Sequence, residues 1–115
     1  MESMGLNNKI VEEDLSFIFN SLSELEKSNL NDANILITGC AGFLGFYMCN
    51  FFLKYSKVLN IQSVIGTDIF LLGKKPDWLE SLSKNHDIFS LYEHDIIKDN
   101  IELTINESQN ITHII

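Results

Sequence analysis

A glycine-rich stretch in the first half of the chain holds the residues whose types and spacing best suit chemistry. Gly39, Gly42 and Gly45 form a G-x-x-G-x-x-G pattern between the apolar run Ile35–Thr38 and an apolar segment with helical spacing. The first N–H groups of a helix lack intrahelical partners and lie at the positive end of its dipole, so they attract anions. We predict a pyrophosphate-binding turn in which Gly39 makes the sharp turn, Gly42 admits the phosphates and Gly45 lets helix and strand pack closely. The Thr38 hydroxyl is expected to bond within the turn, and an ordinary strand-end turn is the structural alternative.

An acidic residue stands where an adenosine ribose would need an acceptor. Asp68 ends the predicted strand 63–68, and it follows Gly45 by 23 residues. A carboxylate there accepts hydrogen bonds from ribose hydroxyls and repels a 2′-phosphate. The chain contains no arginine, so NAD is expected rather than NADP, although Lys74 and Lys75 keep NADP open. The structural alternative for Asp68 is a turn aspartate at a strand end.

A second acid follows the third predicted strand, where the chain would pass the adenine. Asp95 is expected to accept from the adenine amino group, and the Ile96 backbone to contact the ring. A helix N-cap or a solvated turn is the alternative for Asp95.

Other potentially reactive residues lack the partners that their chemistry requires. His86, His94 and His113 are scattered without metal-ligand spacing. Cys40 stands at a helix N-terminus, which can lower a thiol pKa, but no histidine or acid is placed beside it, so we expect a small packing residue. Cys40 and Cys49 do not make a disulfide framework, which favours a reducing compartment. No tyrosine is followed four residues later by lysine.

Composition narrows the classes of partner. The chain has 115 residues and a net charge of −8, and all eight of its basic residues are lysines. We therefore expect no nucleic-acid partner, because such binding needs a basic face. The sequence has no apolar leader and no long apolar run, so a cytoplasmic protein without a membrane span is expected.

Apolar periodicity predicts alternating strands and helices. Strands are expected at 35–38, 63–68, 88–92 and 111–115, and helices at 11–27, 43–56, 76–83 and 98–108. The alternation predicts an α/β protein with a Rossmann-type, doubly wound parallel sheet, incomplete and preceded by an N-terminal amphipathic helix. Residues 1–33 are then a tail, helix and linker, and residues 34–115 the N-terminal part of a NAD(P)-binding Rossmann domain that stops at its fourth strand.

The stretch Ile35-Leu-Ile-Thr-Gly-Cys-Ala-Gly-Phe-Leu-Gly45 resembles the T-G-x-x-G-F-[IL]-G fingerprint of extended short-chain dehydrogenases/reductases. This is the NAD-dependent epimerase/dehydratase family of nucleotide-sugar enzymes. Gly66-Thr-Asp68 and His94-Asp-Ile96 are similar to its ribose and adenine positions, and Thr112–Ile115 to the start of its fourth strand. The resemblance implies cofactor-binding roles for Gly39, Ala41, Gly42, Phe43, Leu44, Gly45, Asp68, Ile69, Asp95 and Ile96. The acidic first helix resembles UDP-glucuronate decarboxylase and dTDP-glucose 4,6-dehydratase members.

The resemblance implies transient hydride transfer during epimerisation, dehydration or decarboxylation of a nucleotide sugar. The family's Tyr-x-x-x-Lys pair has no counterpart here, so we expect the N-terminal piece of a larger enzyme, inactive alone and without assignable catalytic residues. An uncovered fourth strand also predicts a homo-oligomer. Two alternatives stay open: a non-catalytic NAD(P)-binding regulatory module, and an interaction fragment that assembles through the helix at 11–27.

Overall fold

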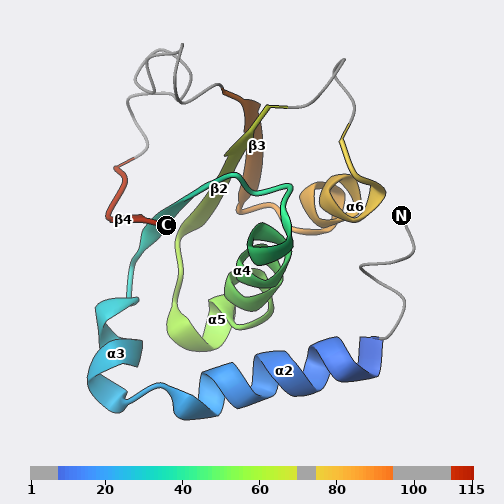
Figure 1. Cartoon of the computed structure of the whole chain (residues 1–115). Coiled ribbons are helices and arrows are strands. Elements are labelled where there is room, and N and C mark those ends of the chain that lie inside the picture. Colours follow the sequence, from blue (N-terminus) through green and yellow to red (C-terminus); the bar gives the residue numbers. More distant parts are fainter. Residues whose placement is uncertain (1–7, 70–74, 95–109) are drawn as a thin grey trace.

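The computed structural model describes residues 8–69, 75–94 and 110–115 (Figure 1). Five helices lie in these ranges: α2 (Asn8–Ser21), α3 (Glu24–Asn29), α4 (Phe43–Lys54), α5 (Ser56–Leu59) and α6 (Asp77–Asn85). The strands are β1 (Asn34–Thr38), β2 (Ser63–Asp68), β3 (Phe89–Glu93) and β4 (His113–Ile114). Within the described ranges, no helix is long and apolar enough to cross a bilayer.

The strands form one parallel sheet in the order β3-β2-β1-β4. The fold is therefore α/β, with a four-stranded parallel sheet flanked by helices, and its strand order is compatible with a Rossmann-like fold. The first strand lies beside the fourth, because Ile35 pairs with His113 and Leu36 with Ile114.

Two apolar clusters bury β1 from opposite sides. Ile35 and Ile37 belong to a large cluster to which α2, α4 and α6 contribute, whereas Leu36 lies in a small cluster with Ile65. The alternation follows from the pleat, which points successive side chains to opposite faces. It explains why β1 is an uninterrupted apolar run, as expected for a strand buried on both faces. The helix expected at 98–108 lies outside the described residues.

The single helix predicted at 11–27 is wrong, because the chain breaks into α2 and α3. Ser23 starts α3 with a capping box: its hydroxyl accepts from the Glu26 N–H at 3.1 Å, and the Glu26 carboxylate accepts from the Ser23 N–H at 2.8 Å. This reciprocal pair satisfies N–H groups that a new helix leaves open. Apolar spacing runs on through the break, and therefore conceals it.

Other predicted boundaries moved by a few residues. The helix expected at 43–56 ends at Lys54, and a separate short helix, α5, follows it at Ser56–Leu59. Asn60 ends α5 in a left-handed conformation with φ 57°. The strand expected at 63–68 is confirmed as β2, while the helix expected at 76–83 begins one residue later and continues to Asn85. The other strands differ from their predicted bounds by at most two residues at either end.

Candidate functional site

The glycine turn lies at the carboxyl end of β1, between that strand and α4 (Figure 1). Gly39 has φ +64°, a left-handed conformation that side-chain-bearing residues rarely adopt. The Gly42 N–H donates to the Gly39 carbonyl at 3.2 Å, and Gly42 is the residue that precedes α4. The predicted order of strand, tight turn and helix is thus present.

Gly45 and Gly42 differ in what the fold requires of them. A Cβ atom at Gly45 would lie 2.3 Å from the Cys40 carbonyl oxygen. This distance is too short for any real contact, and the oxygen belongs to the backbone, which cannot move aside. A Cβ atom at Gly42 would lie 3.5 Å from the Gly39 carbonyl oxygen, an ordinary contact, and Gly42 has φ −82°. The protein's own packing therefore demands glycine at 45 but leaves room for a Cβ atom at 42.

Cys40 forms the floor of the turn. Its side chain is fully buried, and a Cβ atom on Gly66 of β2 would lie 2.9 Å from its sulfur. Burial, together with the charge of Asp68, raises the pKa of this thiol to about 12. The thiol is therefore neutral, and the geometry agrees with the small packing residue expected from the sequence.

Asp68 contacts the turn directly. Its Oδ2 accepts a hydrogen bond from the Ala41 N–H at 2.8 Å, and its Oδ1 accepts from the Ile69 N–H at 2.7 Å. Next to it, the Cys40 N–H donates to the Thr67 carbonyl at 3.1 Å. The end of β2 therefore holds two successive N–H groups of the turn, and the structural alternative, a turn aspartate at a strand end, accounts for both hydrogen bonds of the Asp68 carboxylate.

The expected hydrogen bond of the Thr38 hydroxyl within the turn is wrong. This hydroxyl donates to the Ile115 carbonyl at 3.0 Å, and the Thr38 N–H donates to the same oxygen at 3.0 Å. Thr38 therefore joins β1 to the end of the chain beside β4. The sequence could not show this, because the partner is 77 residues away.

A pocket of about 470 Å³ opens above the turn and the start of α4. Its lining residues are Ile37, Thr38, Gly39, Gly42, Phe43, Leu44, Gly45, Met48 and Ile115. No side chain caps the start of α4, and Phe43 and Leu44 are 66% and 72% exposed. The pocket thus combines an uncapped helix N-terminus with an apolar wall.

The structure brings most of the predicted site residues to one edge of the sheet. Gly39, Ala41, Gly42, Phe43, Leu44, Gly45, Asp68 and Ile69 all lie at the carboxyl ends of β1 and β2 or at the start of α4. Asp95 and Ile96 lie outside the described residues. Sequence reasoning missed Met48 and Ile115 as lining residues; Met48 follows Leu44 by one helical turn, a spacing that would have indicated it.

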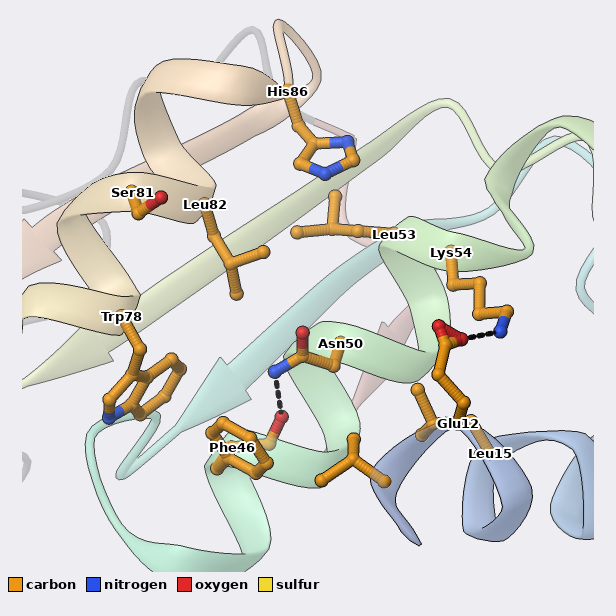
Figure 2. Close-up of a pocket in the computed structure, with 11 residues that line it drawn as sticks. Glu12, Leu15, Phe46, Asn50, Leu53, Lys54, Trp78, Ser81, Leu82 and His86 are labelled. Atoms are coloured by element: carbon orange, nitrogen blue, oxygen red, sulfur yellow. Dashed lines mark hydrogen bonds and ion pairs between the residues drawn. The ribbon is translucent and has the colours of Figure 1, made fainter. Parts of the chain in front are cut away.

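A second cavity of about 530 Å³ lies among α2, α4 and α6. Figure 2 shows the ion pair of Glu12 and Lys54 on one side of it and Trp78 on the other. None of the predicted cofactor-binding residues lines this cavity. This cavity is therefore separate from the candidate site that the sequence predicts at the glycine turn.

Among the described residues, no group of three His, Cys, Asp or Glu side chains gathers to hold a metal ion. Comparison with protein families finds no matching family model, and comparisons with curated proteins and with solved structures find no significant match.

Proposed function

We propose that this chain is the NAD-binding portion of a nucleotide-sugar epimerase, dehydratase or decarboxylase of the extended short-chain dehydrogenase/reductase type. The observation that carries the proposal is made at Gly42. A Cβ atom would fit at this position, so the packing of the protein does not explain why the residue is glycine. Conformation accounts for Gly39 and close packing for Gly45. A pyrophosphate lying on the turn supplies the reason for a glycine at 42.

The start of α4 offers the donors that such a ligand requires. The N–H groups of Phe43, Leu44 and Gly45 come before the first intrahelical bond, which Phe46 makes to the Gly42 carbonyl at 2.9 Å. No side chain caps them. Backbone donors at the positive end of a helix dipole suit phosphate oxygens, and the pocket above them gives the ligand space.

Asp68 supports NAD rather than NADP in this proposal. Two of the roughly four acceptor positions of a carboxylate are used by Ala41 and Ile69, so acceptors are left for ribose hydroxyls. A 2′-phosphate would meet the negative charge, and the chain has no arginine to offset it.

When bound, NAD supplies a hydride acceptor and donor for the sugar carbon. The residues of this chain hold and orient its phosphates and adenosine, and none of them is assigned a catalytic role. The nucleotide-sugar substrate, a homo-oligomeric assembly and a cytoplasmic location belong to the same proposal. A non-catalytic NAD-binding module would share the binding step, so one experiment tests what the two have in common.

Isothermal titration calorimetry with NAD and NADP tests the proposal on three proteins: wild type, Gly42→Val and Phe17→Ala. Wild type should bind NAD more tightly than NADP. Gly42→Val should weaken NAD binding about tenfold or more. The added side chain would keep the charged phosphate oxygens from accepting hydrogen bonds from the N–H groups at the start of α4.

Phe17→Ala is the matched control, because Phe17 is 74% exposed on α2, a helix that contributes no residue to the pocket at the turn. It should leave NAD binding unchanged. Absence of NAD binding by wild type, or equal binding by Gly42→Val, contradicts the proposal. A change of sedimentation in Phe17→Ala, with no NAD binding, would instead support an interaction fragment that assembles through α2.

A further inference from the structure

The Asp68 carboxylate is tied to the backbone on both of its oxygens. Oδ2 accepts from the Ala41 N–H at 2.8 Å and Oδ1 from the Ile69 N–H at 2.7 Å. The side chain cannot turn away without leaving both N–H groups without their acceptor. Asp68 is therefore held in place without any ligand.

The Ala41 N–H belongs to the middle of the glycine turn. On one side, the Cys40 N–H is bound to the Thr67 carbonyl at 3.1 Å, and on the other, the Gly42 N–H is bound to the Gly39 carbonyl at 3.2 Å. Three successive N–H groups of the turn thus have acceptors within the protein, and only that of Ala41 relies on a side chain. The N–H groups that follow, at the start of α4, are the ones without a side-chain cap.

The geometry points to Asp68 as a positioning residue. Its hydrogen bond with the Ala41 N–H, here called the latch, fixes the glycine turn so that the uncapped N–H groups of α4 are oriented toward phosphate before the ligand binds. This inference rests on the proposed function and adds a second task to the carboxylate, beyond acceptance from a ribose. Preorganised donors bind an anion without the cost of ordering the turn.

The latch and a pure ribose acceptor predict different responses to substitution. Asp68→Asn and Asp68→Ala both remove the charge, but only Asp68→Asn keeps a side-chain oxygen that can accept from the Ala41 N–H. The difference between these variants therefore isolates the hydrogen bond from the charge. Glu93→Gln is the matched charge control, because Glu93 is exposed and pairs with Asp68 at the end of the neighbouring strand β3.

The first measurement is amide hydrogen exchange by NMR on the nucleotide-free protein. Asp68→Ala should speed exchange of the Ala41 amide about tenfold or more, since a hydrogen bond to a charged acceptor is lost. Asp68→Asn should fall between Asp68→Ala and wild type, and Glu93→Gln should match wild type. The amide of Leu36 in the middle of β1 serves as an internal reference and should not change.

The second measurement is calorimetric titration with inorganic pyrophosphate, which has no ribose. Asp68→Ala should bind pyrophosphate about fivefold more weakly than Asp68→Asn, the loss of one neutral hydrogen bond. A carboxylate that served only the ribose would give the two variants equal affinity, both tighter than wild type because a negative charge is gone.

The outcomes separate the latch from the proposed function. Unchanged exchange of Ala41 in Asp68→Ala overturns the latch, whatever the ligand data show. Faster exchange of Ala41 with equal pyrophosphate affinity in the two variants overturns its part in phosphate binding. If wild type binds neither pyrophosphate nor NAD, the proposed function fails, and with it the phosphate-binding role of the latch. Faster exchange together with the fivefold difference supports both.

Discussion

Turns with left-handed residues occur at both edges of the sheet, but they are built from different residues. At the amino edge, ahead of β1 and β2, Asp32 and Asn60 both adopt left-handed conformations, with φ 61° and 57°. The Asn60 amide donates to Asp32 at 2.9 Å and to Asn31 at 3.0 Å, and Gln62 also donates to Asp32, at 3.2 Å. Among the described residues at the carboxyl edge, the left-handed residue is Gly39, which has no side chain.

The two edges differ in how their polar groups are satisfied. At the amino edge, polar side chains pair with one another, so the turn is closed by its own groups. At the carboxyl edge, Asp68 is bound to turn backbone and the start of α4 is left uncapped. The uncapped N–H groups at the start of α4 are the donors on which the proposed phosphate site depends, whereas the polar side chains at the amino edge satisfy one another.

The largest expected effect breaks the carboxyl edge itself. Gly45→Ala should destabilise the protein by about 3 kcal/mol or more, because the added Cβ would overlap Cys40 backbone that cannot move aside. Gly42→Ala, its matched control, should change stability by less than about 1 kcal/mol, since its Cβ has room. Urea denaturation measures both, and equal losses would remove the distinction between the two glycines.

A smaller effect is expected at the amino edge. Asn60→Ala should cost about 2 kcal/mol, from left-handed strain and two lost hydrogen bonds. Asn60→Gly loses the same bonds without the strain and should cost about 1 kcal/mol. Neither variant should alter NAD affinity, and a change in calorimetry would show that the two edges are coupled.

The smallest expected effect is a pH dependence of stability that comes from the Cys40 thiol beneath the turn. Because the pKa of the Cys40 thiol is raised from 9.0 to about 12, mainly by burial and next by Asp68, the folded state keeps a proton that the unfolded state releases above pH 9. This contribution to stability is complete below pH 9 and is lost as the pH rises toward 12.

The stability advantage of wild type over Cys40→Ala should accordingly shrink by about 1 kcal/mol between about pH 9 and pH 10. Urea denaturation of both proteins across this range measures it. Using the difference between them cancels the titration of the lysines and tyrosines that they share. A difference that does not vary with pH would mean that the thiol is open to solvent.

Much of the fold followed from local pattern. The apolar run of β1 and the turn residue Gly39 were predictable because strand burial and the sign of φ depend on a few neighbouring residues. The break at Ser23 was also local, written in a Ser-x-x-Glu capping box, but continuous apolar spacing outweighed it. The partner of the Thr38 hydroxyl was not predictable, since only the pairing of β1 with β4 brings Ile115 beside it.

For the candidate site, the sequence by itself determined which residues can adopt a positive φ, allow close approach of another group or accept a hydrogen bond. The glycines and the acid carry these properties in their own covalent structure. Only the tertiary structure decided how they are used. Ala41 and Asp68 are 27 residues apart, and the parallel register that pairs Thr38 with Thr67 brings the end of β2 against the turn. Because that register is set by the packing of the whole sheet, no local pattern could show that the predicted ribose acceptor also holds the turn.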